Sequence, residues 1–151
     1  MMNSWLIDTN VLIYAFDQNN DFHSSSYDLL TYSIAGEISC FIAQQNLLEF
    51  WAVVTNPKRV KNPLSIEETL QKVLIYQASF PIVCPLPKTF ITFSRLISTY
   101  SAFKNRIFDL YLAATALDNG IWHICTWNKK DFLRLSEIKV MTPYEILSNK
   151  G

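Results

Sequence analysis

The chain has 151 residues and a mass of 17.5 kDa, a length that suits a single domain over 1–151 with one core. Half of the residues are hydrophobic, which excludes a disordered chain, and the formal net charge of zero argues against bulk binding of nucleic acid. The charge is nevertheless segregated, because residues 1–57 hold six acids and no Lys or Arg, whereas residues 58–151 hold all 13 basic residues. A local anion-binding surface therefore remains compatible with the sequence.

The cysteines bear on the kind of metal site to expect, and the hydropathy of the chain bears on its cellular location. The three cysteines (Cys40, Cys84 and Cys125) lie far apart inside apolar runs, and we expect buried, reduced thiols rather than a zinc site. No apolar run approaches the ~18 residues of a membrane span, and the first residues lack the basic segment of a signal peptide. We therefore expect a cytoplasmic protein without a membrane partner.

The first half of the chain alternates short apolar runs with longer segments of helical period. Strands are predicted at 5–7 and 38–43. Asn10 is predicted to cap a helix that begins at Val11, because its side chain can accept a bond from a free amide. Further helices are predicted over 22–35, over 44–55, and from a capping box of Ser65 and Glu68 to about Phe80.

The second half continues the same alternation. Strands are predicted at 82–84, 121–126 and 138–141, and helices over 88–102, over 107–119 and from Pro143. The crossovers are long enough to join parallel strands, and the strands are continuous apolar runs, as expected when helices cover both faces of a sheet. The pattern predicts an α/β fold in which helices flank a short parallel sheet of four or five strands.

Four acids stand where core packing does not explain them. Asp8 and Asp131 follow the first and fourth predicted strands, Asp109 lies in the first turn of a helix, and Glu49 lies in an apolar helical segment. Taken singly, Asp8, Asp109 and Asp131 are equally well explained as helix-start or loop acids. Glu49 is harder to explain in that way, because a buried carboxylate without a partner is costly.

The combination of these acids is more informative than any one of them. The carboxyl ends of parallel strands meet at one edge of a sheet, which is where open α/β folds bind ligands. Carboxylates that converge repel one another unless a cation or a proton joins them. With no His or Cys nearby, oxygen ligands favour Mg²⁺ or Mn²⁺, either of which can lower the pKa of a bound water.

Four sequence blocks resemble the PIN-domain family, and in particular its VapC-type toxins of type II toxin–antitoxin pairs. The blocks follow in the family's order and spacing: LIDTNVL at 6–12, NLLEF at 46–50, FDLYLAATA at 108–116 and TWNKKDF at 126–132. The resemblance implies a PIN-like three-layer α/β/α sandwich. It also implies a Mg²⁺-dependent endoribonuclease whose metal-activated water hydrolyses RNA and leaves a 5′-phosphate and a 3′-hydroxyl.

The resemblance also implies roles for individual residues. Asp8, Glu49 and Asp109 match the family's metal-holding acids, and Thr9 and Asn10 match residues that order the site. The fourth block leaves two alternatives, because many members carry an acid two residues after the position of Thr126. Here that place holds Asn128, so either Asp131 is the fourth catalytic and metal-binding acid or Asn128 supplies a neutral oxygen. Phe108 stands where many relatives have a small or polar residue.

Eight of the 13 basic residues lie in three segments near the blocks, and they are candidates for binding RNA phosphates. They are Lys58, Arg59, Lys61, Lys104, Arg106, Lys129, Lys130 and Arg134. Ordinary solvated loop charge explains them about as well. Trp127 could stack on a base, although packing is the commoner role of such a residue.

The resemblance implies three kinds of partner: an RNA substrate, a small antitoxin protein and a second copy of the chain in a homodimer. Two alternatives stay open, an RNA-processing PIN nuclease that is not a toxin and a catalytically inactive PIN fold that only binds. A nucleotide-binding domain of another class is disfavoured, because three glycines (Gly36, Gly120 and Gly151) cannot build a phosphate-binding loop.

Overall fold

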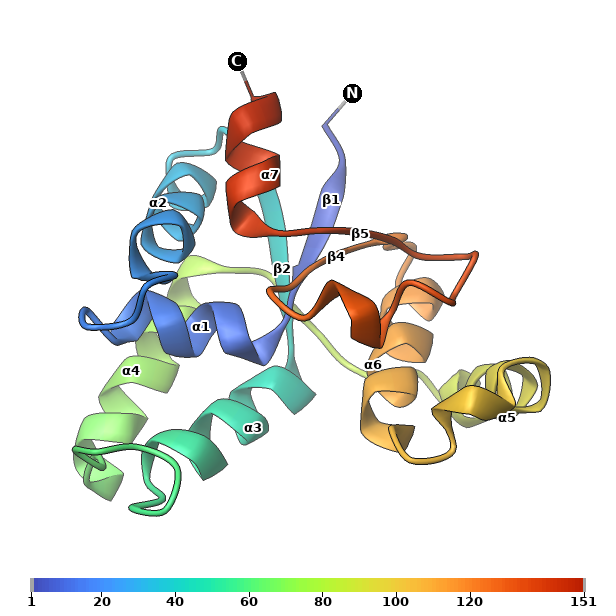
Figure 1. Ribbon diagram of the computed structural model, residues 1–151, viewed down its shortest axis with the longest axis horizontal. Coiled ribbons are helices and arrows are strands. Elements are labelled where there is room, and N and C mark those ends of the chain that lie inside the picture. Colours follow the sequence, from blue (N-terminus) through green and yellow to red (C-terminus); the bar gives the residue numbers. More distant parts are fainter. Residues whose placement is uncertain (1, 151) are drawn as a thin grey trace.

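Five short parallel strands form one sheet in the computed structural model, which describes residues 2–150. The strand order is β3-β2-β1-β4-β5, so β1 lies at the centre (Figure 1). In the register, Leu6 of β1 pairs with Phe41 on one side and with Ile124 on the other. The strands are β1 (Ser4–Ile7), β2 (Ser39–Ala43), β3 (Ile82–Val83), β4 (His123–Cys125) and β5 (Lys139–Met141).

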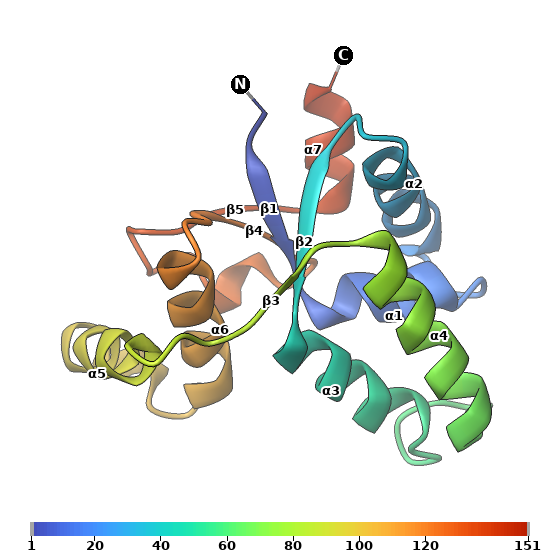
Figure 2. The ribbon, with the colours of Figure 1, turned by 180° about the vertical axis from the view of Figure 1, so that it is seen from behind.

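Seven α-helices form layers on the two faces of this sheet. Figures 1 and 2 show α1–α4 on one side of the strands and α5 and α6 on the other, with α7 beside the amino-terminal part of β1 and β2. Their bounds are α1 (Thr9–Phe16), α2 (His23–Ile34), α3 (Gln44–Val54), α4 (Ile66–Ser79), α5 (Thr89–Thr99), α6 (Ile107–Asp118) and α7 (Pro143–Asn149). The predicted α/β fold with a short, helix-flanked parallel sheet is confirmed.

The core is divided into two apolar clusters by the sheet. Trp5 and Ile7 pack with residues of α1–α4, whereas Leu6 packs with α5 and α6. This alternation follows from the period of two in a strand, which sends successive side chains to opposite faces. Because β1 is apolar on both faces, it is buried in the middle of the molecule, and its carboxyl end opens directly to the residues that follow it.

Three local expectations need correction. The N-cap of α1 is Asp8 rather than Asn10, so the helix begins at Thr9. This places an acid at the helix start, where its carboxylate can accept a backbone N–H bond. The strand at 82–84 is shorter than predicted and excludes Cys84. The helix predicted over 88–102 ends at Thr99, and a short 3₁₀ turn, η1 (Ser101–Phe103), follows.

Other local expectations are confirmed. Ser65 and Glu68 form the predicted capping box, in which each side chain meets the other residue's backbone N–H. Pro143 is the first residue of α7. The three cysteines are unpaired; Cys40 and Cys125 are buried as predicted, and Cys84 is only partly buried. Over residues 2–150, no helix has the length and apolar character needed to cross a membrane.

Candidate active site

Asp8 lies at the junction of β1 and α1 and is held by neutral donors. Its Oδ1 accepts a bond from the backbone N–H of Thr9 at 2.8 Å, and its Oδ2 accepts one from Thr126 Oγ1 at 2.8 Å. The backbone N–H of Asp8 donates to the carbonyl of Cys125 at 2.9 Å, which continues the β1–β4 pairing. The register of two neighbouring strands therefore fixes where this carboxylate lies.

Asn10 ties the start of α1 to the loop after β4. Its Nδ2 donates to Thr126 Oγ1 at 3.0 Å, and its Oδ1 accepts a bond from the backbone N–H of Trp127 at 3.1 Å. Thr126 Oγ1 also accepts from the backbone N–H of Asn128 at 3.1 Å. The residues predicted to support Asp8 thus form one network, although the side chain of Asn128 is exposed at its rim.

Asn46 is a supporting residue that the sequence interpretation did not single out. It is fully buried; its Oδ1 accepts from the backbone N–H of Ala43 at 3.0 Å, and its Nδ2 donates to Thr9 Oγ1 at 3.1 Å. The same side chain therefore caps α3 and ties it to the first turn of α1. The available signal was an amide at the third position of a helix that directly follows a strand, where capping side chains are common.

Gln45 joins α3 to α6 and was also not singled out. Its Nε2 donates to Glu49 Oε1 at 3.1 Å and to the carbonyl oxygen of Phe108 at 2.9 Å. Its Oε1 is buried and has no hydrogen-bond partner among the residues that the structure describes. The neighbours fix the orientation of the Gln45 amide. Glu49 Oε1 and the Phe108 carbonyl are both acceptors, so the NH2 group of the amide must face them.

Asp109 and Asp131 complete the predicted set of acids from the other side. Asp109 lies in the first turn of α6, and Asp131 lies in a second 3₁₀ turn, η2 (Lys129–Asp131). Arg106, the N-cap residue of α6, donates from its guanidinium to Asp131 Oδ1 at 3.0 Å. The same guanidinium lies over the ring of Phe103, with its central carbon 4.7 Å from the ring centre.

Burial and neighbouring carboxylates raise the pKa of three of the acids, Asp8, Glu49 and Asp109. Burial raises the pKa of Asp8 from 3.8 to about 6 against the hydrogen bonds from Thr126 and Thr9, and the charges of Glu49 and Asp131 add to the rise. Burial also raises the pKa of Asp109 to about 6; Asp8 and Asp131 add to this rise, and Arg106 opposes it. The pKa of Glu49 is raised by burial and by Asp109. Such a site favours the uptake of protons or of a cation.

The donor set suits a hard divalent cation. In residues 2–150, no three His, Cys, Asp or Glu side chains already lie close enough together to hold a metal ion. Mg²⁺ retains several water ligands and needs only one or two direct carboxylates, so loosely spaced acids fit it better than they fit zinc. Asp8, Glu49 and Asp109 are the candidates to hold such an ion, with one or two of them binding it directly and the rest through its water ligands.

The predicted basic rim is only partly free to bind phosphate. Arg106 is paired with Asp131, and Lys129 Nζ lies 2.6 Å from Glu145 Oε1. Lys58, Arg59 and Lys61 are exposed in the loop after α3, at the end of that helix far from the sheet (Figure 1). The remaining exposed candidates, which follow η1 or lie around η2, are Lys104, Lys130 and Arg134.

Trp127 packs within the protein. Its ring stacks on Phe22 with 4.3 Å between centroids, and its Nε1 donates to Ser26 Oγ at 2.8 Å. The stacked ring and the hydrogen-bond acceptor both belong to the segment around the start of α2. The packing role therefore accounts for this residue, and base stacking is not needed to explain it.

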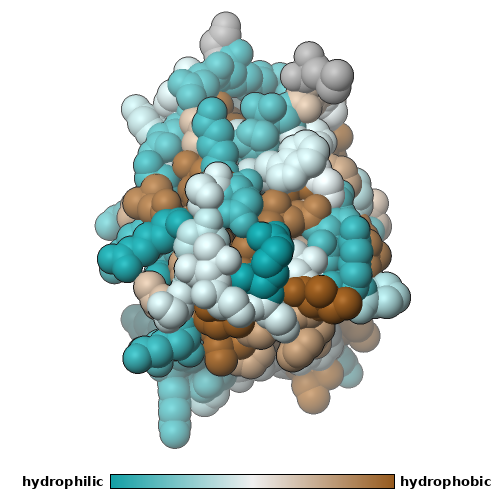
Figure 3. Space-filling model, turned by 90° about the vertical axis from the view of Figure 1, so that its right-hand side faces the viewer, coloured by the Kyte–Doolittle hydropathy of each residue, from teal (hydrophilic) through white to brown (hydrophobic). Residues whose placement is uncertain are grey.

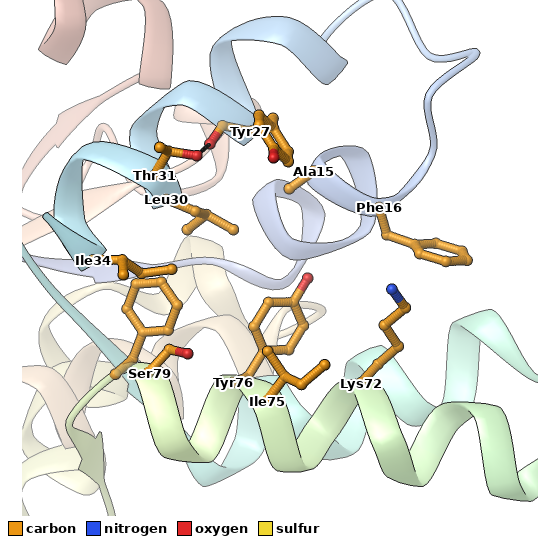
Figure 4. Close-up of a pocket in the computed structure, with 11 residues that line it drawn as sticks. Ala15, Phe16, Tyr27, Leu30, Thr31, Ile34, Lys72, Ile75, Tyr76 and Ser79 are labelled. Atoms are coloured by element: carbon orange, nitrogen blue, oxygen red, sulfur yellow. Dashed lines mark hydrogen bonds between the residues drawn. The ribbon is translucent and has the colours of Figure 1, made fainter.

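An apolar pocket lies away from the acids, between α2 and α4 (Figure 4). It has a volume of about 210 Å³ and is walled mainly by carbon, including exposed parts of Tyr27, Ile34 and Ile75. Figure 4 shows Lys72 pointing toward its rim beside Phe16. With no carboxylate in its lining, the pocket suits contact with an apolar surface rather than phosphate chemistry.

Solved structures share this fold over nearly the whole chain. VapBC2 from Rickettsia felis, solved with a DNA fragment of its promoter, gives a TM-score of 0.67 at 20% identity, covering 92% of this chain and 98% of that one. A toxin–antitoxin complex from Klebsiella pneumoniae gives 0.65 at 22%, with coverages of 93% and 98%. DNA-bound VapBC from Salmonella typhimurium gives 0.66 at 15%, with coverages of 95% and 99%. These likenesses establish the fold.

A comparison with curated proteins gave no match. The profile of the PIN domain matches residues 5–138, which include all four acids of the site. That match covers most of the chain, and the fold agrees with it. The chain belongs to the PIN domain family.

Proposed function

We propose that this protein is a Mg²⁺-dependent endoribonuclease, the toxin of a VapBC-type pair, that hydrolyses RNA phosphodiesters. The observation that carries the proposal is the convergence of four acids from separate elements: Glu49 and Asp131 raise the pKa of Asp8, Asp8 and Asp131 raise that of Asp109, and Asp109 raises that of Glu49. PIN domains are nucleases, and a divalent-ion nuclease requires a group of carboxylates whose negative charge exceeds that of the neighbouring cations.

The chain's own residues prepare the site for this chemistry. Mg²⁺, or Mn²⁺ in its place, would lower the pKa of a water molecule and stabilise the charge that develops on the phosphoryl oxygens. Thr9 and Thr126 orient the carboxylate of Asp8, Gln45 orients Glu49, and the amino-terminal end of α6 stabilises charge on Asp109. Cleavage should leave a 5′-phosphate and a 3′-hydroxyl.

Substrate and protein partners follow from the surface. Exposed Lys104 and Lys130 are the basic residues best suited to RNA phosphates flanking the scissile bond, because within residues 2–150 neither is in an ion pair and each is close in sequence to a site acid. We infer an antitoxin partner from the toxin–antitoxin complexes that share the fold. The apolar pocket between α2 and α4 supports such a contact.

Self-association is the third part of the proposal. The face that carries α5 shows large apolar areas between polar ones (Figure 3), and Phe90 and Ile91 of α5 are strongly exposed. Apolar surface of this kind is typical of protein contacts. We expect a homodimer at micromolar concentration, and a molar mass near 17.5 kDa by light scattering would contradict it.

The decisive experiment compares the wild-type chain with Asp109→Asn and with a control, Asp118→Asn. Asp118 lies at the other end of α6, where its Oδ1 accepts a bond from Thr92 that an asparagine can retain. We expect Asp109→Asn to lower RNA cleavage by at least about 100-fold while the fold is kept, and Asp118→Asn to cleave normally. Cleavage is followed by mapping new RNA 5′ ends after induced expression.

The same experiment separates the alternatives. Growth arrest together with new 5′ ends, both absent in Asp109→Asn, supports a toxin. New ends without arrest indicate an RNA-processing nuclease. Equal cleavage by wild type and Asp109→Asn would overturn the assignment of the site, and a folded wild-type chain that neither cleaves RNA nor binds Mn²⁺ would indicate a binding module.

A further inference from the structure

One cation already lies inside the acidic cluster. Arg106 precedes the first turn of α6, and its guanidinium donates to Asp131 Oδ1 at 3.0 Å. The charge of Arg106 also opposes the rise in the pKa of Asp109 that burial causes.

The guanidinium is held in place from two directions. It lies over the ring of Phe103, which is fully buried and belongs to the 3₁₀ turn η1. The side chains of the pair are 31% and 24% exposed, whereas in the surface pair of Arg95 with Glu137 the arginine is 58% exposed. A partly desolvated, ring-supported ion pair persists more than an exposed one. Arg106 is therefore a fixed part of the site.

The charges can be counted in the RNA-free protein. Four ionised acids give a charge of −4, and Arg106 leaves −3. One divalent ion would bring this to −1, whereas two would produce an excess of +1 in a partly buried site. Because excess charge of the cations' own sign weakens the binding of a second ion, the set of groups matches one divalent cation.

We propose that Arg106 takes the place of a second metal ion beside Asp131, so that the protein binds a single divalent cation among Asp8, Glu49 and Asp109. This inference rests on the proposed function and sharpens it. Asp131 then acts as the partner of Arg106 and is not a metal ligand. Arg106 is a positioning residue, because it orders the turn that carries Asp131 against the start of α6.

The test counts bound Mn²⁺ directly, by electron paramagnetic resonance of free Mn²⁺ and by titration calorimetry at pH 7.5. We expect one ion per wild-type chain. Arg106→Gln frees Asp131 from its partner and should bind a second ion, whereas Arg106→Lys, which keeps the charge, should bind one. The double variant of Arg106→Gln with Asp131→Asn should return to one ion.

A matched control is Arg95→Gln, which removes an arginine from a carboxylate pair with Glu137 on the surface. It should bind one ion with wild-type affinity. Two ions in the wild type, or a single ion in folded Arg106→Gln, would overturn the proposal.

A second measurement covers the case in which Arg106→Gln does not fold. Asp131→Glu alone keeps the charge of the site, and it should change the affinity for the first ion by less than about threefold, since Asp131 does not bind that ion. A loss of about 10-fold or more would show that Asp131 is a ligand and would overturn the proposal. Wild-type protein that binds no Mn²⁺ at all would contradict the proposed function itself, and the inference with it.

Discussion

The two sides of the active site are held by different means. On the strand side, backbone register and short polar side chains fix Asp8, and the bonds come from Thr9, Asn10 and Thr126. On the helix side, long side chains reach between elements: Gln45 joins α3 to α6, and Arg106 joins α6 to η2. The strand side is therefore a rigid platform, and the helix side depends on a few contacts that one substitution can remove.

The largest effect is expected where the strand side is broken. Thr126→Val removes the hydroxyl that donates to Asp8 and accepts from Asn10 and from the N–H of Asn128. Loss of the buried hydrogen bond from Thr126 to the carboxylate of Asp8 should lower the free energy of unfolding by about 1–3 kcal/mol. RNA cleavage should fall about 10- to 100-fold.

Thr115→Val provides the control for that change. Thr115 is also buried, but its hydroxyl donates only to the carbonyl of Tyr111 within α6. Urea unfolding and cleavage assays on both variants test the difference. Equal losses in the two proteins would show that Thr126 has no special role.

The next effect is a dependence of stability on pH that the strand side creates. The pKa of Asp8 is raised to about 6 in the folded protein, so the folded state holds the proton more tightly than the unfolded chain does. Stability from this group is full below about pH 4 and is lost as the pH rises through 6. With EDTA present to remove divalent cations, we expect the free energy of unfolding to fall by about 1–2 kcal/mol between pH 4 and pH 7.

Asp8→Asn checks the origin of that slope. The variant should have a flatter stability profile and be more stable than wild type at pH 7, because it has no carboxylate to ionise there. Some slope should remain from Asp109, whose pKa is also raised to about 6. Urea denaturation at several pH values provides the measurement, and an unchanged slope in Asp8→Asn would contradict the prediction.

A smaller effect is expected on the helix side. Gln45→Met keeps the length of the side chain but removes the bonds to Glu49 and to the carbonyl of Phe108. Cleavage should fall about 10-fold, as for other groups that orient a metal-binding side chain. Stability should change little, because the substitution also removes the unpartnered Oε1. Gln44→Met, at an exposed neighbouring position, is the control and should cleave normally.

The smallest effects on cleavage are expected from the exposed lysines, and they should differ between lysines close to the site acids and lysines far from them. Lys104→Gln and Lys130→Gln should each raise KM about two- to threefold and lower the salt dependence of binding, with kcat unchanged. Lys58→Gln and Lys61→Gln, in the loop beyond the far end of α3, should have no measurable effect on KM. The reverse ranking would place the RNA along α3 instead of across η2.

The sequence predicted the strand side well because local rules control it. An apolar run that ends at Asp8 and a polar residue after the fourth strand are enough to place both at one edge of a parallel sheet. Even here the cap of α1 was assigned two residues late, because Asp and Asn are equally good capping residues. The acids themselves were identified from the sequence, and their roles as metal ligands stay predictions.

The helix side was less accessible to sequence reasoning. Gln45 and Phe108 are 63 residues apart, and no periodicity indicates that they meet. Arg106 was interpreted as part of a basic rim, whereas the structure pairs it with Asp131. Such contacts depend on how two helices approach each other, and that packing is decided by the whole core.

The hydrogen bond between Thr126 and Asp8 spans 118 residues of sequence. During synthesis Asp8 is made long before Thr126, which donates to its carboxylate, and before β4, which pairs with β1. At about 5–20 residues per second, that interval lasts roughly 6–24 seconds. A nascent chain interrupted before β4 would carry Asp8, Glu49 and Asp109 without the strand that holds the first of them. The hydrogen-bond network around Asp8 is therefore complete only after β4 has been synthesised.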